Sequence, residues 1–186
     1  MNLFYELSED DRILAVCDGW DDFGRANNAS KLGADVIGYP IWQFISGQDT
    51  RSYMNSIFFS CRSYARPLTA LYRGDSPEMM RVYRMTVAPL PDLGLRLTHH
   101  LTAEMPHWHD PPVRRIPRAL VQCSQCLSLQ TPQAWAPGPG PAFRAKGEIS
   151  YHVCPDCRQS LSRQIERTAL SEVAASRPKG GGVLTA

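Results

Sequence analysis

The chain contains two short stretches that decide how its second half can fold: VQCSQCLSL at residues 121–129 and YHVCPDCRQS at residues 151–160. Each contains a Cys-x-x-Cys pair, Cys123 with Cys126 and Cys154 with Cys157, and 27 residues separate the two pairs. One such turn offers two thiolates from a single bend, so two turns supply the four soft donors of a tetrahedral metal ion. The spacing therefore predicts a four-cysteine metal site.

Zinc is the metal that this spacing favours. Four sulfur ligands leave no coordination position for a water molecule, so we expect a structural site and not a catalytic one. Iron on four thiolates is a second interpretation, because the sequence does not separate iron from zinc. A third is a pair of redox-active dithiols, since Cys-x-x-Cys spacing favours local disulfides. A covalent c-type haem is disfavoured, because Leu127 and Arg158 stand where that motif requires histidine.

The composition of the 186 residues is that of a globular protein, with 43% hydrophobic and 20% charged residues. No apolar run reaches the ~18–20 residues that a membrane span requires. The acidic start MNLFYELSEDDR lacks the basic and apolar regions of a secretion signal. Six cysteines, four of them in metal spacing, suit a reducing compartment. We therefore expect a soluble cytoplasmic protein with no membrane partner, in which Cys17 and Cys61 are small core residues.

Charge divides the chain into two unlike halves. Residues 1–112 carry ten Lys/Arg and fourteen Asp/Glu, a net charge of −4. Residues 113–186 carry ten Lys/Arg and four Asp/Glu, a net charge of +6. A basic half permits contact with nucleic acid or with an acidic partner, although such charge is usually just solvated.

The hydrophobic pattern of the first half predicts one strand, short helices and then an antiparallel meander. In chain order, the predicted segments are a short helix or turn at 2–9, a strand at 12–20, a helix at 51–64, and strands at 67–75, 81–90 and 93–104. The first segment would place Leu3, Phe4 and Leu7 on one face, and the continuous apolar run of the second suits the interior of a sheet. Asp49 or Thr50 would cap the helix. We expect an α+β arrangement, a single antiparallel sheet covered on one face by short helices.

Three strings in this half resemble PAS-like sensor domains: ILAVCDGWDDFGRANN, ADVIGYPIWQFISG and RPLTALYRGDSPEMMRVYRMTVAPLPD. Gly38, Trp42, Phe44 and Ile45 match the turn that precedes the longer helix of that family, and Asn27 matches an asparagine before it. The resemblance covers about residues 10–104. It implies a strand, short helices, that turn, the longer helix and three antiparallel strands. It also implies a cavity that in some relatives holds haem, flavin or a small metabolite, and the sequence names no ligand for it here.

Four histidines offer nitrogen atoms that could ligate a metal. His99 and His100 are adjacent in the last predicted strand, so one faces inward and the other outward. Either is a conceivable haem ligand, but a histidine in a strand is more often a packed or exposed residue. His107 and His109 bracket Trp108 and are expected at the surface, because no further ligand follows in a suitable spacing.

Residues 104–118, EMPHWHDPPVRRIPR, contain four prolines and indicate a boundary between modules. We therefore predict a PAS-like domain at 1–104, a proline-rich linker at 105–118, the four-cysteine module at 119–176 and a disordered tail at 177–186. We call each Cys-x-x-Cys turn a knuckle, the first at residues 123–126 and the second at residues 154–157. Within the module, the order of strand, first knuckle, Pro/Gly-rich loop, strand and second knuckle resembles a zinc ribbon. With only ~40 residues in it, this unit buries too little apolar surface to fold without its metal.

A C-terminal helix follows the second knuckle. Pro155 suits the first helical position, and residues 158–175 place Leu161, Ile165, Ala169 and Val173 on one face. In order of expectation, this stripe packs on the PAS-like domain, on a second copy of the chain, or on a partner protein.

No catalytic constellation is apparent, since the sequence lacks a phosphate-binding glycine loop, GxSxG, HExxH and a histidine-kinase box. We expect a non-enzymatic, bacterial-type signalling or regulatory protein, in which a PAS-like sensory or interaction domain is joined to a structural zinc module that contacts a partner protein. Dimerisation is common among such domains. One alternative is a nucleic-acid-binding regulator that uses the basic zinc ribbon, disfavoured because no aromatic residues are interleaved with its arginines. The other is a thiol redox switch that releases metal on oxidation.

Overall fold

The computed structural model describes residues 2–22, 33–75, 79–106, 120–137 and 149–176, and for Asn2 and residues 172–176 only the backbone is described. The helices with both ends among the described residues are α2 (Gly33–Val36), the 3-10 helix η1 (Ile41–Gln43), α3 (Gln48–Tyr64) and α4 (Pro155–Ser176). The strands are β1 (Asn2–Leu7), β2 (Ile13–Val16), β3 (Leu68–Arg73), β4 (Met79–Pro89), β5 (Leu95–Pro106), β6 (Leu120–Cys123), β7 (Leu129–Gln130), β8 (Trp135–Ala136) and β9 (Ile149–His152). We call residues 2–106 the large unit and residues 120–176 the small unit.

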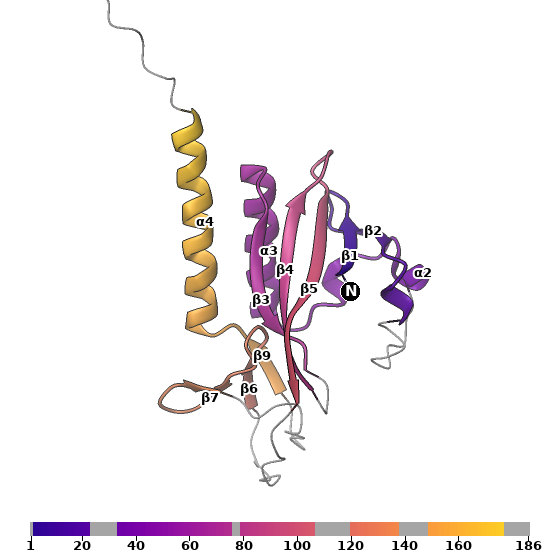
Figure 1. The fold of residues 1–186 in the computed structure, drawn as a ribbon. Helices are drawn as coiled ribbons and strands as arrows, with labels where there is room; N and C mark the ends of the chain where they lie inside the picture. The colour runs from indigo at the N-terminus through magenta and orange to yellow at the C-terminus, as the bar shows by residue number, and fades with distance from the viewer. Residues whose placement is uncertain (1, 23–32, 76–78, 107–119, 138–148, 177–186) are drawn as a thin grey trace, which may run out of the picture.

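The large unit is built on a five-stranded antiparallel sheet with the strand order β2-β1-β5-β4-β3 (Figure 1). Strand β1 lies between β2 and β5, so the predicted helix or turn at residues 2–9 is wrong. The reason is the period of the pattern. Leu3, Tyr5 and Leu7 alternate and are all buried, as in a strand, whereas the prediction grouped Leu3 with Phe4.

The strand predicted at residues 12–20 is present as the shorter β2, but at the edge of the sheet and not in its interior. Ile13 is buried, whereas the side chain of Leu14 is 56% exposed. An apolar run of four residues does not distinguish an interior strand from an edge strand, because an edge strand can carry an exposed leucine without forming a large patch.

Helix α3 covers one face of the sheet and forms the core with it. Its buried residues recur at intervals of three or four, and they are Tyr53, Met54, Ile57, Phe58, Ser60 and Cys61. They meet the inward-facing residues of the strands, among them Leu68, Ala70, Met85, Val87, Leu95 and Leu97. This arrangement confirms a mixed α+β fold with an antiparallel sheet, and the three C-terminal strands of the large unit lie close to their predicted ranges.

Capping of α3 by Asp49 or Thr50 is wrong. The helix begins at Gln48, and its N-cap is Gly47, which has φ 83° and makes no side-chain capping bond. Asp49 lies within the first turn, where the helix dipole favours a carboxylate. Its side chain is therefore available for contacts outside α3.

The small unit contains a four-stranded sheet with the order β8-β7-β6-β9. Strands β6 and β9 are parallel and pair from Leu120 with Ile149 to Cys123 with His152. Since both strands run the same way, each delivers its Cys-x-x-Cys turn to the same end of the sheet. Helix α4 follows and begins at Pro155, the predicted first position.

Helix α4 lies alongside α3 and β3 (Figure 1). Val153 and Leu161 of the small unit are buried in the core cluster of the large unit, and Ile165 packs against it. Packing of the C-terminal helix on the first half of the chain is therefore confirmed for these described residues.

Strand β5 continues to Pro106, past the predicted boundary at residue 104. The predictions for Asn27, His107, His109 and the tail fall outside the described residues. No helix in the described part of the chain combines the length and the apolar character needed to cross a membrane.

Candidate metal centre

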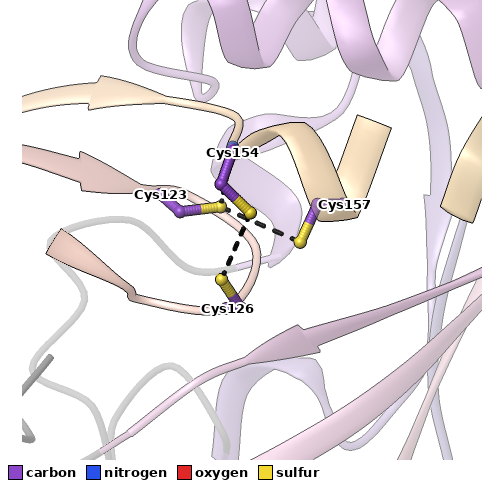
Figure 2. Close-up of side chains that lie close together, drawn as sticks. All are labelled: Cys123, Cys126, Cys154 and Cys157. Carbon is purple, nitrogen blue, oxygen red and sulfur yellow. Dashed lines mark hydrogen bonds between the residues drawn. The ribbon is translucent and has the colours of Figure 1, made fainter. Parts of the chain in front are cut away.

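The four predicted cysteines meet in one cluster (Figure 2). Their sulfur atoms all lie within 4.8 Å of one another. Cys123 Sγ is 3.9 Å from Cys157 Sγ, and Cys126 Sγ is 3.6 Å from Cys154 Sγ. Both short distances join one knuckle to the other, and all four cysteines are free. A pairing of the sulfurs into disulfides, which needs S–S distances of about 2.05 Å, is not what the structure contains.

These distances fit a single tetrahedral ion. Metal–sulfur bonds of about 2.3 Å, the usual length in zinc thiolate sites, place the sulfurs of a regular tetrahedron about 3.8 Å apart. Four thiolates are also a donor set that selects soft metals over calcium or magnesium. The cluster can thus hold one thiophilic ion, with Cys123, Cys126, Cys154 and Cys157 as its complete shell.

The protein shields two of these sulfurs more than the others. Cys123 and Cys154 are buried, whereas Cys126 and Cys157 are half-buried. Cys123 Sγ accepts hydrogen bonds from the backbone N–H groups of Gln125 and Cys154, at 3.4 and 3.3 Å. Such bonds spread the negative charge of a thiolate into the backbone.

The thiol pKa values report the same crowding of charge. Interaction with the Cys157 thiol, together with the backbone N–H groups, outweighs burial and lowers the pKa of Cys123 to about 4. The pKa of Cys157 is raised in turn, first by its hydrogen bond to Cys123 and then by burial. Burial raises the pKa of Cys154 to about 11. Four neighbouring thiols without a cation therefore do not all ionise, and a bound dication is what would deprotonate the whole set.

The first knuckle owes its shape to local hydrogen bonds. The Leu127 N–H donates to the Cys123 carbonyl at 3.0 Å, and the Cys123 N–H donates to the Ser128 carbonyl at 2.8 Å. Leu127 takes the left-handed conformation, with φ 59°, that reverses the chain after Cys126. The knuckle is thus a closed turn that presents both sulfurs on one side.

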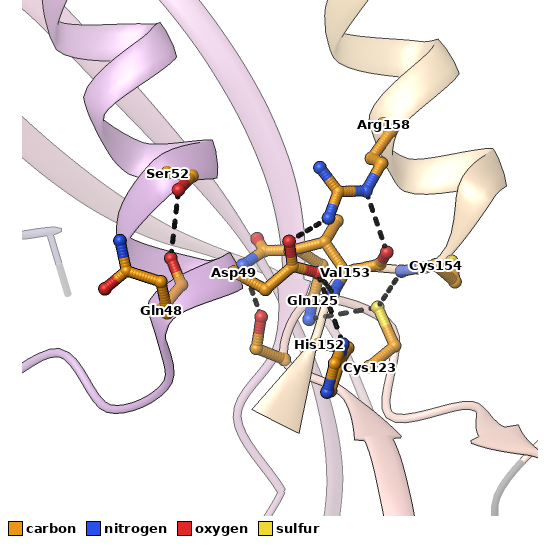
Figure 3. Close-up of polar contacts among 10 residues, drawn as sticks. Gln48, Asp49, Ser52, Cys123, Gln125, His152, Val153, Cys154 and Arg158 are labelled. Carbon is orange, nitrogen blue, oxygen red and sulfur yellow. Dashed lines mark hydrogen bonds and ion pairs between the residues drawn. The ribbon is translucent and has the colours of Figure 1, made fainter. Parts of the chain in front are cut away.

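Asp49 of α3 holds the second knuckle in place (Figure 3). One carboxylate oxygen accepts the Val153 N–H at 2.7 Å, and the other pairs with the Arg158 guanidinium. Arg158 also donates to the Val153 carbonyl, at 3.1 Å. Burial alone would raise the pKa of Asp49, but the bonds from Arg158 and Val153 outweigh it and hold that pKa below its usual value. A single carboxylate thus links α3 to the residue before Cys154 and to the first turn of α4.

Two further contacts connect the small unit to β3. The Arg73 N–H donates to the carbonyl of Gln125, within the first knuckle, at 2.7 Å. The Gln164 side chain of α4 bonds Thr69 twice, accepting from its N–H at 3.0 Å and donating to its hydroxyl at 2.7 Å. The first knuckle is thereby attached to the backbone of β3, and the second knuckle is attached to the Asp49 carboxylate of α3.

Gly47 permits the close approach of β9 to α3. A Cβ at this position would lie 2.8 Å from the Tyr151 carbonyl oxygen, and the φ of 83° also favours glycine. The N-terminus of α3 can lie against β9, the strand that leads into the second knuckle, only because Gly47 has no side chain.

The cluster itself was predictable from the spacing of its cysteines, whereas its attachments were not. By its position Asp49 suits only a capping role, and Gln125 and Gln164 carry no sequence signal. An acidic residue in the first turn of a helix is too common to indicate a distant partner. Of the two adjacent histidines in β5, His99 is half-buried and His100 is exposed, as alternation predicted. Neither lies among the residues of the cluster.

Fold and site together define a mixed α+β protein with a four-cysteine cluster that can hold a metal ion. No protein-family model matches the chain, and no curated protein matches it. Among solved structures, the chain is similar to a domain of an HTR-like protein from Haloarcula marismortui ATCC 43049. That similarity covers 55% of this chain and 98% of the other, with 10% sequence identity and a TM-score of 0.41. This similarity is weak.

Proposed function

We propose that the chain is a non-enzymatic, bacterial-type signalling or regulatory protein of the cytoplasm. In this proposal the large unit is a PAS-like sensory or interaction domain, and the small unit is a structural zinc module that contacts a partner protein. The observation that carries the proposal is the attachment of the cysteine cluster to α3 through Asp49. A displacement of α3 would move the second knuckle and the start of α4 with it.

The order of elements in the large unit supports the PAS-like assignment. A strand, short helical segments, the turn around Gly38 and Trp42, the longer helix α3 and three antiparallel strands follow one another, as the resemblance implies. The turn itself is fixed by one backbone conformation and one side-chain contact. Gly38 has φ 84°, and the Trp42 indole donates to Asp11 at 3.0 Å.

The donor set supports zinc as the metal and a structural role for it. Four cysteine ligands close a tetrahedral shell, so no position is left for substrate or water. Zinc is redox-inert and suits a site that holds a fold together, whereas iron in the same shell would serve electron transfer. Four free thiols at metal-binding distance also favour the reducing cytoplasm.

A groove beside the cluster is our candidate for the partner surface. It has a volume of about 650 Å³ and lies between β3, α4 and the small sheet. Leu71, which is 57% exposed, and the half-buried Trp135 line it, and the cysteine cluster forms part of its wall. A surface that adjoins both units and combines exposed apolar side chains with polar ones suits a protein partner better than a nucleic acid, which would require a basic surface.

Elemental analysis of the purified full chain tests the metal assignment. We expect one zinc per chain and no visible absorption band. One iron per chain with thiolate-to-iron absorption would contradict the zinc assignment.

The partner surface can be tested with a photo-crosslinking residue placed at Leu71 in cells that express the protein naturally. The matched control is Leu14, an exposed leucine on the opposite edge strand. A protein captured from Leu71 and not from Leu14 supports the proposal. Capture of a second copy would make the surface a homodimer interface, and salt-sensitive binding of nucleic acid would favour the alternative regulator.

One observation favours a thiol switch as a second candidate function. The half-buried Cys126 and Cys157 both line the groove, so a small oxidant has a path to them. Oxidation of these thiolates would release the ion. Zinc stoichiometry and a free-thiol count, measured before and after peroxide treatment, decide this candidate. Retention of zinc at peroxide levels that oxidise ordinary surface thiols would exclude it.

A further inference from the structure

A second cavity, of about 470 Å³, also borders the first knuckle. Its walls come from the sheet, from the N-terminal half of α3 and from the small unit. The sheet contributes Tyr5 and His99, α3 contributes Thr50, and the first knuckle contributes Gln125 and Leu127. The cavity is therefore complete only when the first knuckle is ordered.

Two buried polar atoms of the residues that line this cavity, His99 Nε2 and Thr50 Oγ1, have no hydrogen-bond partner among the described residues. An unpaired buried polar atom costs about 1–3 kcal/mol, so two of them in one cavity require an explanation. A bound molecule with a hydrogen-bonding group would satisfy both.

The position of the His99 ring is fixed by its neighbours. Its Nδ1 lies 2.9 Å from the Tyr72 hydroxyl. The ring stacks on Tyr5, with centroids 5.4 Å apart and planes at 25°, and meets Tyr72 edge-on at 5.7 Å. Because Nδ1 is already paired, Nε2 is the atom left for a ligand. The Tyr72 hydroxyl can donate to Nδ1 or accept from it, so Nε2 can either donate or accept.

The cavity is uncharged. None of its described lining residues is Lys, Arg, Asp or Glu. Burial lowers the pKa of His99 to about 4, so the imidazole is neutral at physiological pH. An ionised ligand would lose part of its hydration on this surface and gain no counter-charge. Aromatic rings and the methionines Met54 and Met85 line much of the remaining wall, together with Ser46 and Ser124, which suits a flat and mostly apolar body.

Gln125 connects this cavity to the metal centre. It lies between the two cysteines of the first knuckle and is itself buried. Its N–H donates to Cys123 Sγ, and its carbonyl accepts the N–H of Arg73 from β3. The same residue therefore touches the cavity, a metal ligand and the sheet.

We propose that this cavity binds a neutral, flat and mostly apolar molecule through His99 Nε2 and Thr50 Oγ1, and that binding is linked to metal occupancy through the first knuckle. The inference rests on the proposed function and deepens it, since it gives the chemical class of the signal. If the ordered knuckle increases ligand affinity by some factor, the ligand increases metal affinity by the same factor.

Three probes of one ring system test the binding site on the full, metal-loaded chain. Titration calorimetry with 2-naphthol, naphthalene and 2-naphthoate separates the hydrogen bond from the charge. We expect 2-naphthol to bind, naphthalene to bind several-fold more weakly, and 2-naphthoate at least tenfold more weakly. No binding of 2-naphthol, or equal binding of the anion, would overturn the proposal.

Adjacent histidines provide the matched variants. We expect His99→Phe, which keeps a planar ring but removes Nε2, to weaken 2-naphthol binding about tenfold, the effect of one buried hydrogen bond. His100→Phe, on the exposed neighbour, should leave binding unchanged. Thr50→Val removes the second polar atom with little change in shape and keeps the test open if His99→Phe does not fold. Unchanged binding in Thr50→Val and in a folded His99→Phe would assign the probe to another surface.

The link to the metal is tested by the rate at which a chromophoric chelator removes zinc. We expect saturating 2-naphthol to slow this removal several-fold in the wild type and in His100→Phe, but not in His99→Phe. Equal rates with and without 2-naphthol would refute the link even if the probe binds.

A chain that holds zinc but not 2-naphthol leaves the proposed function standing and refutes this inference. A purified chain that lacks bound metal contradicts both. A haem absorption band that disappears in His99→Phe would replace the proposed ligand class by an iron porphyrin.

Discussion

The large and small units are stabilised in different ways. The large unit buries apolar side chains from a helix and five strands in one continuous core. Among the described side chains of the small unit, the buried ones are few, and two of the apolar ones, Val153 and Leu161, belong to the core of the large unit. We therefore propose that the small unit depends on a metal ion, in addition to its attachment to α3 and β3. One chain thus combines a core that suffices for itself with a lobe that does not.

The largest difference between the units should follow from Cys154→Ser. Loss of one buried ligand removes most of the metal-binding free energy, which is about 10–16 kcal/mol in small zinc-dependent domains. We expect zinc content to fall to near zero. Amide exchange should become fast in β6 and β9 while β4 and β5 stay protected, as hydrogen exchange can measure. Cys17→Ser, at a half-buried cysteine outside the cluster, is the control and should retain zinc. Equal loss of protection in both units would show that they fold as one.

A smaller effect is expected from Gly47→Ala, which acts where the units touch. The added Cβ would lie 2.8 Å from the Tyr151 carbonyl, and φ is positive. We expect a loss of about 2–4 kcal/mol in the free energy of unfolding, measured with urea. Gly38→Ala is the matched control, since its φ is 84° but nothing lies within 4 Å of the added Cβ. The control should lose only about 1–2 kcal/mol from backbone strain. Equal losses would mean that the close approach does not limit the interface.

Asp49→Asn acts at another point of the same interface and should weaken the attachment of the small unit to α3. The amide keeps one acceptor but loses the charge that pairs with Arg158, which is itself partly exposed, so we expect a loss of about 1–2 kcal/mol. Because the folded-state pKa of Asp49 is lowered, its contribution is present above the unfolded pKa and disappears as pH falls through the folded one. The stability difference between wild type and variant should therefore shrink in acid. Asp156→Asn, an exposed first-turn carboxylate of α4, is the control and should change stability little. A difference that persists after Asp49 is protonated would count against the ion pair.

The smallest effect concerns His99, a residue of the large unit, and depends on pH. Burial holds the folded-state pKa of His99 at about 4, below the unfolded value of 6.5. The unfolded chain therefore takes up a proton first, and stability falls as pH decreases between these values. We expect His99 to account for about 1 kcal/mol of the loss between about pH 7 and about pH 5.5. Urea unfolding of His99→Phe should lack this portion of the slope, while His100→Phe should retain it. Identical slopes in the two variants would place the titrating group elsewhere.

The sequence predicted the cysteine cluster well because metal chemistry imposes a strict spacing on its ligands. It predicted α3 and the meander for a similar reason, since their apolar residues follow clear periods of three to four and of two. It failed at β1, where Leu3, Phe4, Tyr5 and Leu7 admit both a strand and a helix reading. Only pairing with β2 and β5, strands separated from each other by some eighty residues, decides between them.

The contacts that join the units were beyond the reach of sequence patterns. Asp49 meets Val153 and Arg158, more than a hundred residues away, and Gln164 meets Thr69 across a similar separation. Single hydrogen bonds of this kind leave no periodic signal. The unpaired atoms of His99 and Thr50 are of the same kind, because they depend on the packing of three separate elements around one cavity.

Strand β3 ends the five-stranded sheet, and an outer strand ordinarily leaves a row of backbone donors and acceptors open to other chains. Here the N–H groups of Thr69 and Arg73, which point away from β4, are taken by Gln164 and by the Gln125 carbonyl. The small unit thus acts as a cover for that border. If the cluster holds zinc as proposed, depletion of that zinc would uncover the border, and the protein should then self-associate through β3 before its main core unfolds.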